Sequence, residues 1–317
     1  MQLGIVIPTR NRATKLERTL QSLLAQTTPL QDFEVVVVDN DSSDDTPEML
    51  RQFWGRFPNW RCLKQTKPGA AAARNSGVES CKSQILLFLD DDVIAEPDLV
   101  QQHLNSHHLQ PGSAVLGYVR NGWSDNDSAF RWILSHKELI HSFQFPDPLS
   151  VPFQHLYTCN ASVPREALLK AGLFDERFVG AAFEDTDLGY RLTRSGCPLI
   201  FNAHATVTHN PVLSLKSFMQ KRSAAGRALH QLLSKHPQLE ETLLPSTWRR
   251  ILRCSLGWIA SPLTFTFEGR VPFAPVLLPL LGKACGYHFE YLFWTGYYRE
   301  ARLENRTTEN AVCRPAS

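Results

Sequence analysis

Short apolar runs alternate with amphipathic segments along the first 95 residues of the chain. Residues 3–7 and 33–38 are apolar and β-branched enough to form strands, and residues 13–26 place leucines on one face of a helix. Residues 85–89 are a third apolar run, typical of a strand buried on both faces, although periodicity alone does not separate it from a buried helix segment. Strands that alternate with helices in this way predict a parallel sheet with right-handed crossovers.

Three consecutive carboxylates, Asp90, Asp91 and Asp92, directly follow the third apolar run. Unpaired, they would repel one another by roughly 1 to 4 kcal/mol per pair, depending on the local dielectric. A divalent cation would relieve this repulsion, and in an extended backbone Asp90 and Asp92 would face the same side. Asp39 ends the strand predicted at residues 33–38, so Asp39 and Asp90 are expected at one ligand crevice, where an open α/β sheet binds its ligand. The triplet favours a metal site, with helix capping by Asp91 or Asp92 as the alternative.

Shorter elements follow. Residues 98–110 are predicted to be helical and residues 114–119 to form a strand, whereas residues 121–155 are irregular, as binding loops often are. A second acidic cluster, Glu184-Asp185, opens a helix, where carboxylates are common for electrostatic reasons alone. Residues 198–209 read as two short strands that end at His209, and a lone histidine at a strand end is more often structural than a ligand.

From residue 214 onward the chain is basic. Residues 214–317 carry fourteen Lys and Arg against seven Asp and Glu, a net charge of +7, so residues 1–213 carry −5 of the total of +2. A basic part suits a phosphate-bearing partner or a membrane surface. Two apolar stretches, residues 254–267 and 271–282, are shorter than the about 20 residues that a helix needs to cross a bilayer. They suit either an interfacial membrane segment or a helical subdomain packed on the sheet.

The composition narrows the class of protein. With 43% hydrophobic and 20% charged residues, the chain is expected to fold rather than to be disordered. Seven cysteines without a C-x-x-C pair argue against a disulfide framework and against a zinc cluster, so reduced, cytoplasmic surroundings are expected. The first residues lack a basic leader and read as a strand rather than as a signal peptide.

Several segments in collinear order, over roughly residues 3–215, resemble the family 2 glycosyltransferases, which are inverting, nucleotide-sugar-dependent enzymes of GT-A-type fold. The resemblance is carried by residues 5–12, 37–42, 69–77 and 90–92, by Asn160-Ala161-Ser162 before Gly172-Leu173-Phe174-Asp175, and by Glu184-Asp185 and His209. It implies an α/β fold with a mostly parallel, Rossmann-like sheet, helices on both faces and a helical C-terminal extension. The domains would be residues 1–213, with a nucleotide-binding half at 1–120 and an acceptor-binding half at 121–213, and residues 214–317.

The resemblance also implies roles for single residues. Those expected to bind the donor nucleotide are Pro8, Thr9, Arg12, Asp39, Arg74, Asp90 and Asp91. Asp90 and Asp92 match the metal-binding motif, and His209 matches a further metal ligand of some members, with His204 as its rival. Asp185 matches the catalytic base, with Glu184 beside it. The cation would be Mn²⁺ or Mg²⁺, with an imidazole ligand favouring Mn²⁺.

The implied reaction is metal-assisted transfer of one sugar, with inversion, from a nucleoside-diphosphate sugar to a hydroxyl of a saccharide or lipid-linked acceptor. Such an acceptor would fit polysaccharide or cell-envelope synthesis at the inner face of the membrane, with peripheral membrane contact and no nucleic-acid partner. The Q-x-x-R-W stretch of processive synthases does not occur, which predicts transfer of single residues. Asp41 stands where many relatives have glycine, which bears on the turn after Asp39.

Other functions are weighed against this one. A sugar-phosphate nucleotidyltransferase would carry a glycine-rich loop after the first strand, where this chain has Thr9-Arg10-Asn11-Arg12. A dinucleotide-dependent oxidoreductase would show G-x-G-x-x-G, which does not occur. A nucleotide-sugar-binding protein that has lost catalysis is the non-enzymatic alternative.

Overall fold

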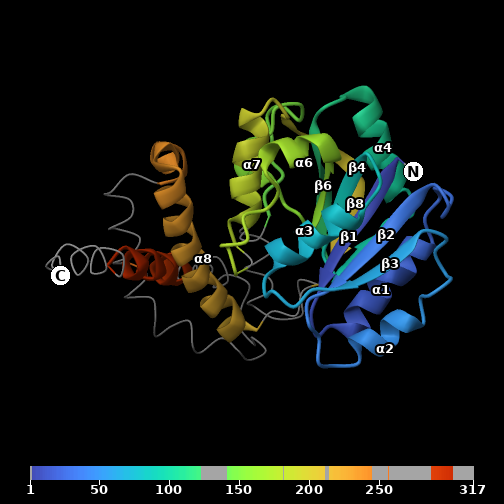
Figure 1. Ribbon diagram of the computed structural model, residues 1–317. Coiled ribbons are helices and arrows are strands. Elements are labelled where there is room, and N and C mark those ends of the chain that lie inside the picture. Colours follow the sequence, from blue (N-terminus) through green and yellow to red (C-terminus); the bar gives the residue numbers. More distant parts are fainter. Residues whose placement is uncertain are drawn as a thin grey trace, which may run out of the picture. The chain divides into compact units, whose positions relative to one another are not determined.

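The computed structural model describes residues 2–122, 141–180, 182–210, 214–244, 256 and 287–302. These residues fall into two compact units. The first unit, described over residues 2–122, 141–180 and 182–210, is an α/β unit built on an eight-stranded sheet (Figure 1). The expected domain boundary after residue 213 adjoins residues 211–213, outside the described residues, and stays a prediction.

The sheet is mostly parallel, as predicted. Its strands are β1 (Leu3–Thr9), β2 (Phe33–Asp39), β3 (Trp60–Lys64), β4 (Ile85–Leu89), β5 (Val93–Ala95), β6 (Ala114–Asn121), β7 (Asn160–Pro164) and β8 (Leu199–His209). They lie in the order β3-β2-β1-β4-β7-β6-β8-β5. The first four strands are parallel, as are β6 and β8. Strand β7 runs antiparallel to both β4 and β6, and β5 runs antiparallel to β8.

Helices cover both faces of this sheet, which also agrees with the prediction. They are α1 (Ala13–Leu24), α2 (Thr46–Arg51), α3 (Ala70–Ser80), α4 (Leu99–Leu109), α6 (Arg165–Ala171) and α7 (Glu184–Arg194), with a 3₁₀ turn η1 (Phe153–His155). Because strand residues alternate between faces, Ile5 packs with the leucines of α1, whereas Val6 packs with the alanines of α3. Burial on both faces explains why the central strands read as continuous apolar runs.

Helix α3 lies close to the sheet because it carries a glycine at the contact. A Cβ atom at Gly77 would collide with Cγ1 of Val6 on β1. The helix begins after Gly69, whose φ of +117° is open to glycine and strained for other residues. The two glycines therefore set where α3 starts and how closely it packs.

Three features differ from the sequence-based expectation. Strands β3 and β5 were not predicted, since β3 is half-exposed with a mixed pattern and β5 has only three residues. Residues 199–209 form one strand rather than two, with a bulge opposite Gly117 and Tyr118 of β6. Strand β4 ends at Leu89, so the acidic triplet forms a turn rather than continuing the strand.

The described part of the second unit is helical. It contains α8 (Leu215–Lys235), η2 (Pro237–Leu239), α9 (Glu240–Leu243) and a helix at residues 287–302. A Cβ atom at Gly226 would collide with the carbonyl of Phe293, and one at Gly296 with the carbonyl of Ser223, so two glycines allow α8 and the helix at 287–302 to pack closely. The ring centroids of Phe218 and Phe289 lie 4.8 Å apart.

Some expectations fall on residues that the structure does not describe. Apart from Leu256, the apolar stretches 254–267 and 271–282 lie outside the described residues, as do residues 123–140 of the predicted binding loop. Within the described ranges, no helix combines the length and the apolar character needed to cross a bilayer.

Candidate active site

The candidate residues gather at the carboxyl ends of the parallel strands. Thr9 ends β1 and lies in register with Asp39, which ends β2. Asp90 directly follows β4, the other neighbour of β1. His209 ends β8 opposite Val93, the residue after the triplet. The strand order thus brings together residues that are up to 200 positions apart in the sequence.

Asp90, Asp92 and His209 converge as the sequence predicted. Their potential ligand atoms all lie within 4.8 Å of one another, and His209 Nε2 donates to Asp92 Oδ1 over 3.0 Å. Nδ1 of His209 is buried and has no hydrogen-bond partner among the described residues. His204 is exposed on the bulge of β8, away from this group. Two carboxylates and one imidazole form a donor set that fits Mn²⁺ or Mg²⁺.

Basic side chains contact the same carboxylates. Arg12 Nη1 lies 2.9 Å from both Asp91 Oδ1 and Asp92 Oδ2, and Lys15 Nζ lies 3.3 Å from Asp92 Oδ2. Thr9 Oγ1 donates to Asp91 Oδ2 over 2.7 Å. Thr9 and Arg12, expected at the nucleotide, therefore contact the acidic triplet in this structure and offset part of its repulsion.

The pKa values of the two buried carboxylates of the triplet, Asp91 and Asp92, are shifted in opposite directions. Burial raises the pKa of Asp91 to about 6, against the charge of Arg12 and the hydrogen bond from Thr9. Burial also acts to raise the pKa of Asp92, but the hydrogen bond and charge of His209, followed by the charges of Arg12 and Lys15, hold that pKa well below its ordinary value. Asp92 therefore stays ionised in the folded protein, and carboxylates bind metal ions in their ionised form.

Arg74 connects the triplet with the second acidic cluster. Its Nη2 lies 3.2 Å from Asp90 Oδ1, and its Nη1 lies 3.0 Å from Glu184 Oε1 at the start of α7. Only 5% of the Arg74 side chain is exposed, and within the described structure its Nε and Glu184 Oε2 have no hydrogen-bond partner. Polar atoms that stay unpaired when buried are costly and are typical of sites that receive a ligand.

Asp185 follows Glu184 in the first turn of α7. Burial, and then the neighbouring charge of Glu184, raise the pKa of Asp185 to about 7, and its Oδ1 accepts from the backbone N–H of Thr186 over 2.8 Å. Phe183, which precedes the helix, has a φ of +65°. A bulky residue in this left-handed conformation is strained, and such strain gathers at functional sites. The start of α7 thus combines a carboxyl of raised pKa with a strained backbone.

The turn after β2 shows how the chain accommodates Asp41, which stands where many relatives have glycine. Asp41 has a φ of +60°, a conformation that glycine adopts freely and that aspartate tolerates. Asp39 is buried, and its Oδ1 accepts from the backbone N–H of Ser42 over 3.0 Å. Pro8 is half-buried beside Val38 of β2. The aspartate is thus compatible with the turn that the resemblance requires.

Comparison with known proteins now decides the family. The model of the family described as "Glycosyl transferase family 2" matches residues 4–170, just over half of the chain. The chain belongs to glycosyl transferase family 2. This confirms the resemblance seen in the sequence.

Two relatives are similar to this chain over part of their own length. Validoxylamine A glucosyltransferase from Streptomyces hygroscopicus subsp. jinggangensis is 35% identical over 222 residues, which cover 62% of this chain and 52% of the relative. Chondroitin synthase from Escherichia coli is 30% identical over 226 residues, covering 62% of this chain and 32% of the relative. The chain spans about half the length of the first of these relatives.

Two solved structures share the fold. The mannosyltransferase PcManGT from Pyrobaculum calidifontis has a TM-score of 0.58 and 17% identity, covering 99% of this chain and 81% of that one. S. aureus TarS 1–349 has a TM-score of 0.53 and 15% identity, covering 94% of this chain and 92% of that one. These similarities confirm the GT-A-type fold.

Sequence reasoning missed three side chains that lie beside the candidate residues. Lys15 contacts Asp92, and its place in the first turn of α1 could have been read from the helix pattern. Cys159 and His141 contact each other, with Sγ and Nε2 3.5 Å apart, and the ring of His141 lies 5.8 Å from that of His209. Burial, and then the charges of Asp90 and other nearby carboxylates, raise the pKa of Cys159 well above its ordinary value, so this thiol stays protonated. No sequence pattern indicated this pair.

Proposed function

We propose that the chain is an inverting glycosyltransferase that moves one sugar from a nucleoside-diphosphate sugar to a hydroxyl of a saccharide or lipid-linked acceptor. One observation carries the proposal. A cation-binding group (Asp90, Asp92 and His209) and a carboxylate whose pKa is raised (Asp185) lie at the same edge of the sheet, with Arg74 between them.

The donor binds at the ends of β1, β2 and β4 in this proposal. Thr9, Arg12 and Asp39 hold the nucleoside together with Pro8 and Asp91, and Arg74 lies toward the diphosphate and the sugar. Support comes from TarS, which has been solved in complex with UDP and with UDP-GlcNAc, and from PcManGT, solved in complex with GDP-Man and Mn²⁺. An arginine is suited to this position because its planar guanidinium offers several donors to phosphate oxygens.

Asp90, Asp92 and His209 hold the divalent cation in this proposal. A bound Mn²⁺ or Mg²⁺ acts as a Lewis acid that offsets the charge of the departing diphosphate. The low pKa of Asp92 supports this assignment, because the carboxylate is already ionised when the cation arrives. Lys15, which contacts Asp92 here, is placed to move to the phosphates of the donor.

Asp185 acts as the general base. Its carboxylate accepts the proton of the acceptor hydroxyl, whose oxygen forms the new bond to the anomeric carbon. The bond between that carbon and the diphosphate oxygen breaks, and the nucleoside diphosphate leaves with the bonding electrons. A single displacement of this kind inverts the anomeric centre. A base is most effective when its pKa lies near the working pH, which suits a carboxyl raised to about 7.

The same proposal assigns a separate role to each of three segments of the chain. Residues 1–120 bind the donor, residues 121–213 bind the acceptor, and the basic residues 214–317 give peripheral contact with an anionic membrane surface. The reaction would take place on the cytoplasmic side, at the inner face of the membrane, and would contribute to a polysaccharide of the cell envelope.

Release of nucleoside diphosphate from a panel of UDP-sugars and GDP-sugars tests the proposal. The purified chain is incubated with each donor, with Mn²⁺, Mg²⁺ or EDTA, and with a panel of saccharide acceptors. We expect one donor to be consumed only with a divalent cation, and a product whose anomeric configuration, read by proton NMR, is opposite to that of the donor. A product that retains the configuration would contradict the proposed base.

A further inference from the structure

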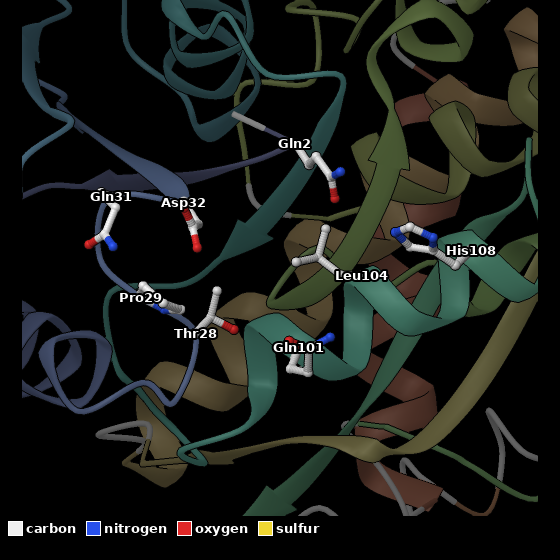
Figure 2. Close-up of a pocket in the computed structure, with 8 residues that line it drawn as sticks. All are labelled: Gln2, Thr28, Pro29, Gln31, Asp32, Gln101, Leu104 and His108. Carbon is white, nitrogen blue, oxygen red and sulfur yellow. The ribbon is translucent and has the colours of Figure 1, made fainter.

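A cavity of about 400 Å³, whose lining residues are drawn in Figure 2, opens at the amino-terminal edge of the sheet. The candidate active site lies at the opposite edge, where β1 ends at Thr9. Its walls are the loop between α1 and β2, the start of β1, and one face of α4; the lining residues are Gln2, Thr28, Pro29, Gln31, Asp32, Gln101, Leu104 and His108. Strand β1 has seven residues, so about 20 Å of strand separates this cavity from Thr9 at the active-site edge. One sugar cannot occupy both places.

The walls of the cavity are held together by hydrogen bonds. The backbone N–H of Thr27 donates to the carbonyl of Pro97 over 2.7 Å. Gln26 Nε2 donates to the carbonyl of Glu96 over 2.8 Å, and Gln26 Oε1 accepts from the backbone N–H of Val100 over 3.0 Å. The loop after α1 is therefore fixed to the first turn of α4, and the cavity is formed before any ligand binds.

One buried polar atom in the wall of the cavity has no hydrogen-bond partner in the described structure. Thr28 is 5% exposed, and its Oγ1 makes no hydrogen bond with the rest of the described structure. A buried hydroxyl without a partner destabilises the protein unless a ligand or water satisfies it. Gln101, Leu104 and His108 lie three and four residues apart on α4, so all three face the cavity that Thr28 also lines (Figure 2).

The lining identifies the class of ligand. No lysine or arginine contributes to it, which disfavours phosphates and nucleotides, and no phenylalanine, tyrosine or tryptophan is present to stack on a base. Three carboxamides, a carboxylate, an imidazole and a hydroxyl offer both donors and acceptors to pairs of neighbouring hydroxyl groups. The volume lies in the range in which proteins hold small molecules. We infer that this cavity is a second carbohydrate site, which binds an uncharged sugar through its hydroxyl groups, separately from the active site.

Saturation-transfer NMR tests the inference, with methyl β-glucoside, N-acetylglucosamine, methyl α-mannoside and cellopentaose as probes. We expect saturation transfer from the wild-type protein to at least one probe, unchanged by UDP or GDP with Mn²⁺. Gln101→Trp fills the cavity and should remove the transfer, whereas Gln110→Trp, a matched change on an exposed residue beyond the same helix, should retain it. Thr28→Val should weaken binding at least tenfold and leave the unfolding temperature unchanged or higher.

The probes also separate two sources of the sugar. Tighter binding of cellopentaose than of the monosaccharides indicates a segment of a longer glycan, and equal binding indicates a free sugar. The inference is overturned if the folded protein transfers saturation to no probe, if the nucleotide with Mn²⁺ abolishes the transfer, or if Gln101→Trp leaves it intact. These results do not depend on whether the chain transfers sugars, so failure here is distinct from failure of the proposed reaction.

Discussion

His209 Nε2 lies 3.0 Å from Asp92 Oδ1, although 117 residues separate the two along the chain. Antiparallel pairing of β5 with β8 places Val93 opposite His209, and the backbone N–H of Asn210 donates to the carbonyl of Asp92 over 3.0 Å. The backbone therefore fixes both partners. A pair held in this way can receive a cation without rearrangement of the sheet.

Asp92→Asn should weaken Mn²⁺ binding strongly. The change removes the carboxylate that contacts His209, and even changes to residues that merely support metal ligands cost about 10- to 100-fold in affinity. We expect a loss of at least about 100-fold in a titration of Mn²⁺ followed by electron paramagnetic resonance. Glu79→Gln, which neutralises an exposed carboxylate on α3, is the matched control and should bind as the wild type does. Equal Mn²⁺ affinity in Asp92→Asn and wild type would contradict the assignment.

Asp185→Asn should separate binding from chemistry. The amide keeps the size of the side chain but cannot accept the proton of the acceptor, and loss of a general base costs typically 10²- to 10⁴-fold in rate. We expect kcat to fall within that range while the Kd of the donor, measured by calorimetry, changes by less than about threefold, since a threefold change is well under 1 kcal/mol. A donor Kd that rises as much as kcat falls would place Asp185 in binding rather than in catalysis.

The rate of transfer should depend on pH through Asp185. Burial and the charge of Glu184 raise the pKa of Asp185 to about 7, and only the deprotonated form is a base, so kcat should rise with pH through about 7. The free energy of unfolding should change with pH in the opposite direction to kcat. A carboxyl with a raised pKa binds its proton more tightly in the folded state, so its contribution to stability is present at low pH and is lost as pH rises through about 7.

Asp185→Asn provides the control for this pH dependence. The substitution should remove the rise in any residual rate near pH 7, and it should raise the unfolding temperature relative to wild type more at pH 8 than at pH 5. An identical pH profile for the variant would show that another group titrates.

Gly77→Ala should destabilise the first unit. The new Cβ would overlap Cγ1 of Val6, and overpacking of this kind costs about 1–3 kcal/mol in the free energy of unfolding. The better helix propensity of alanine offsets up to about 1 kcal/mol of this cost. Gly180→Ala, where the new Cβ meets no atom of the described residues within 4 Å other than its chain neighbours, should stay within about 0.5 kcal/mol of wild type. Urea denaturation compares the two, and equal stability would contradict the close packing of α3.

Much of the fold could be read from the sequence because its central strands are buried on both faces. Residues 85–89 pass from a continuous apolar run to three carboxylates, which marks both the strand and the edge where it ends. Strand β3 escaped prediction because its alternate residues are exposed, and β5 because it is too short for any period to appear. The sequence alone did not decide the conformation of the turn after Asp39, because aspartate and glycine can both adopt the positive φ found at Asp41.

The site could be predicted in part. Parallel strands that end in carboxylates must meet at one edge, so Asp39 and Asp90 were expected together. The contacts of Arg12 and Lys15 with Asp92 depend on long side chains at the start of α1 and just before it, and no local pattern encodes their reach. The cavity at the other edge depends on how α4 packs beside the loop after α1, which no motif records.

The most direct test of the central claim is thermal unfolding of the chain with UDP, GDP and other nucleoside diphosphates, each with and without Mn²⁺. A ligand at 100 times its Kd adds about 2.7 kcal/mol to the free energy of unfolding. We predict that one nucleotide raises the unfolding temperature only when Mn²⁺ is present, and that Asp92→Asn abolishes the shift. The absence of a shift with every nucleotide and Mn²⁺, in a folded sample, would contradict the proposed donor site.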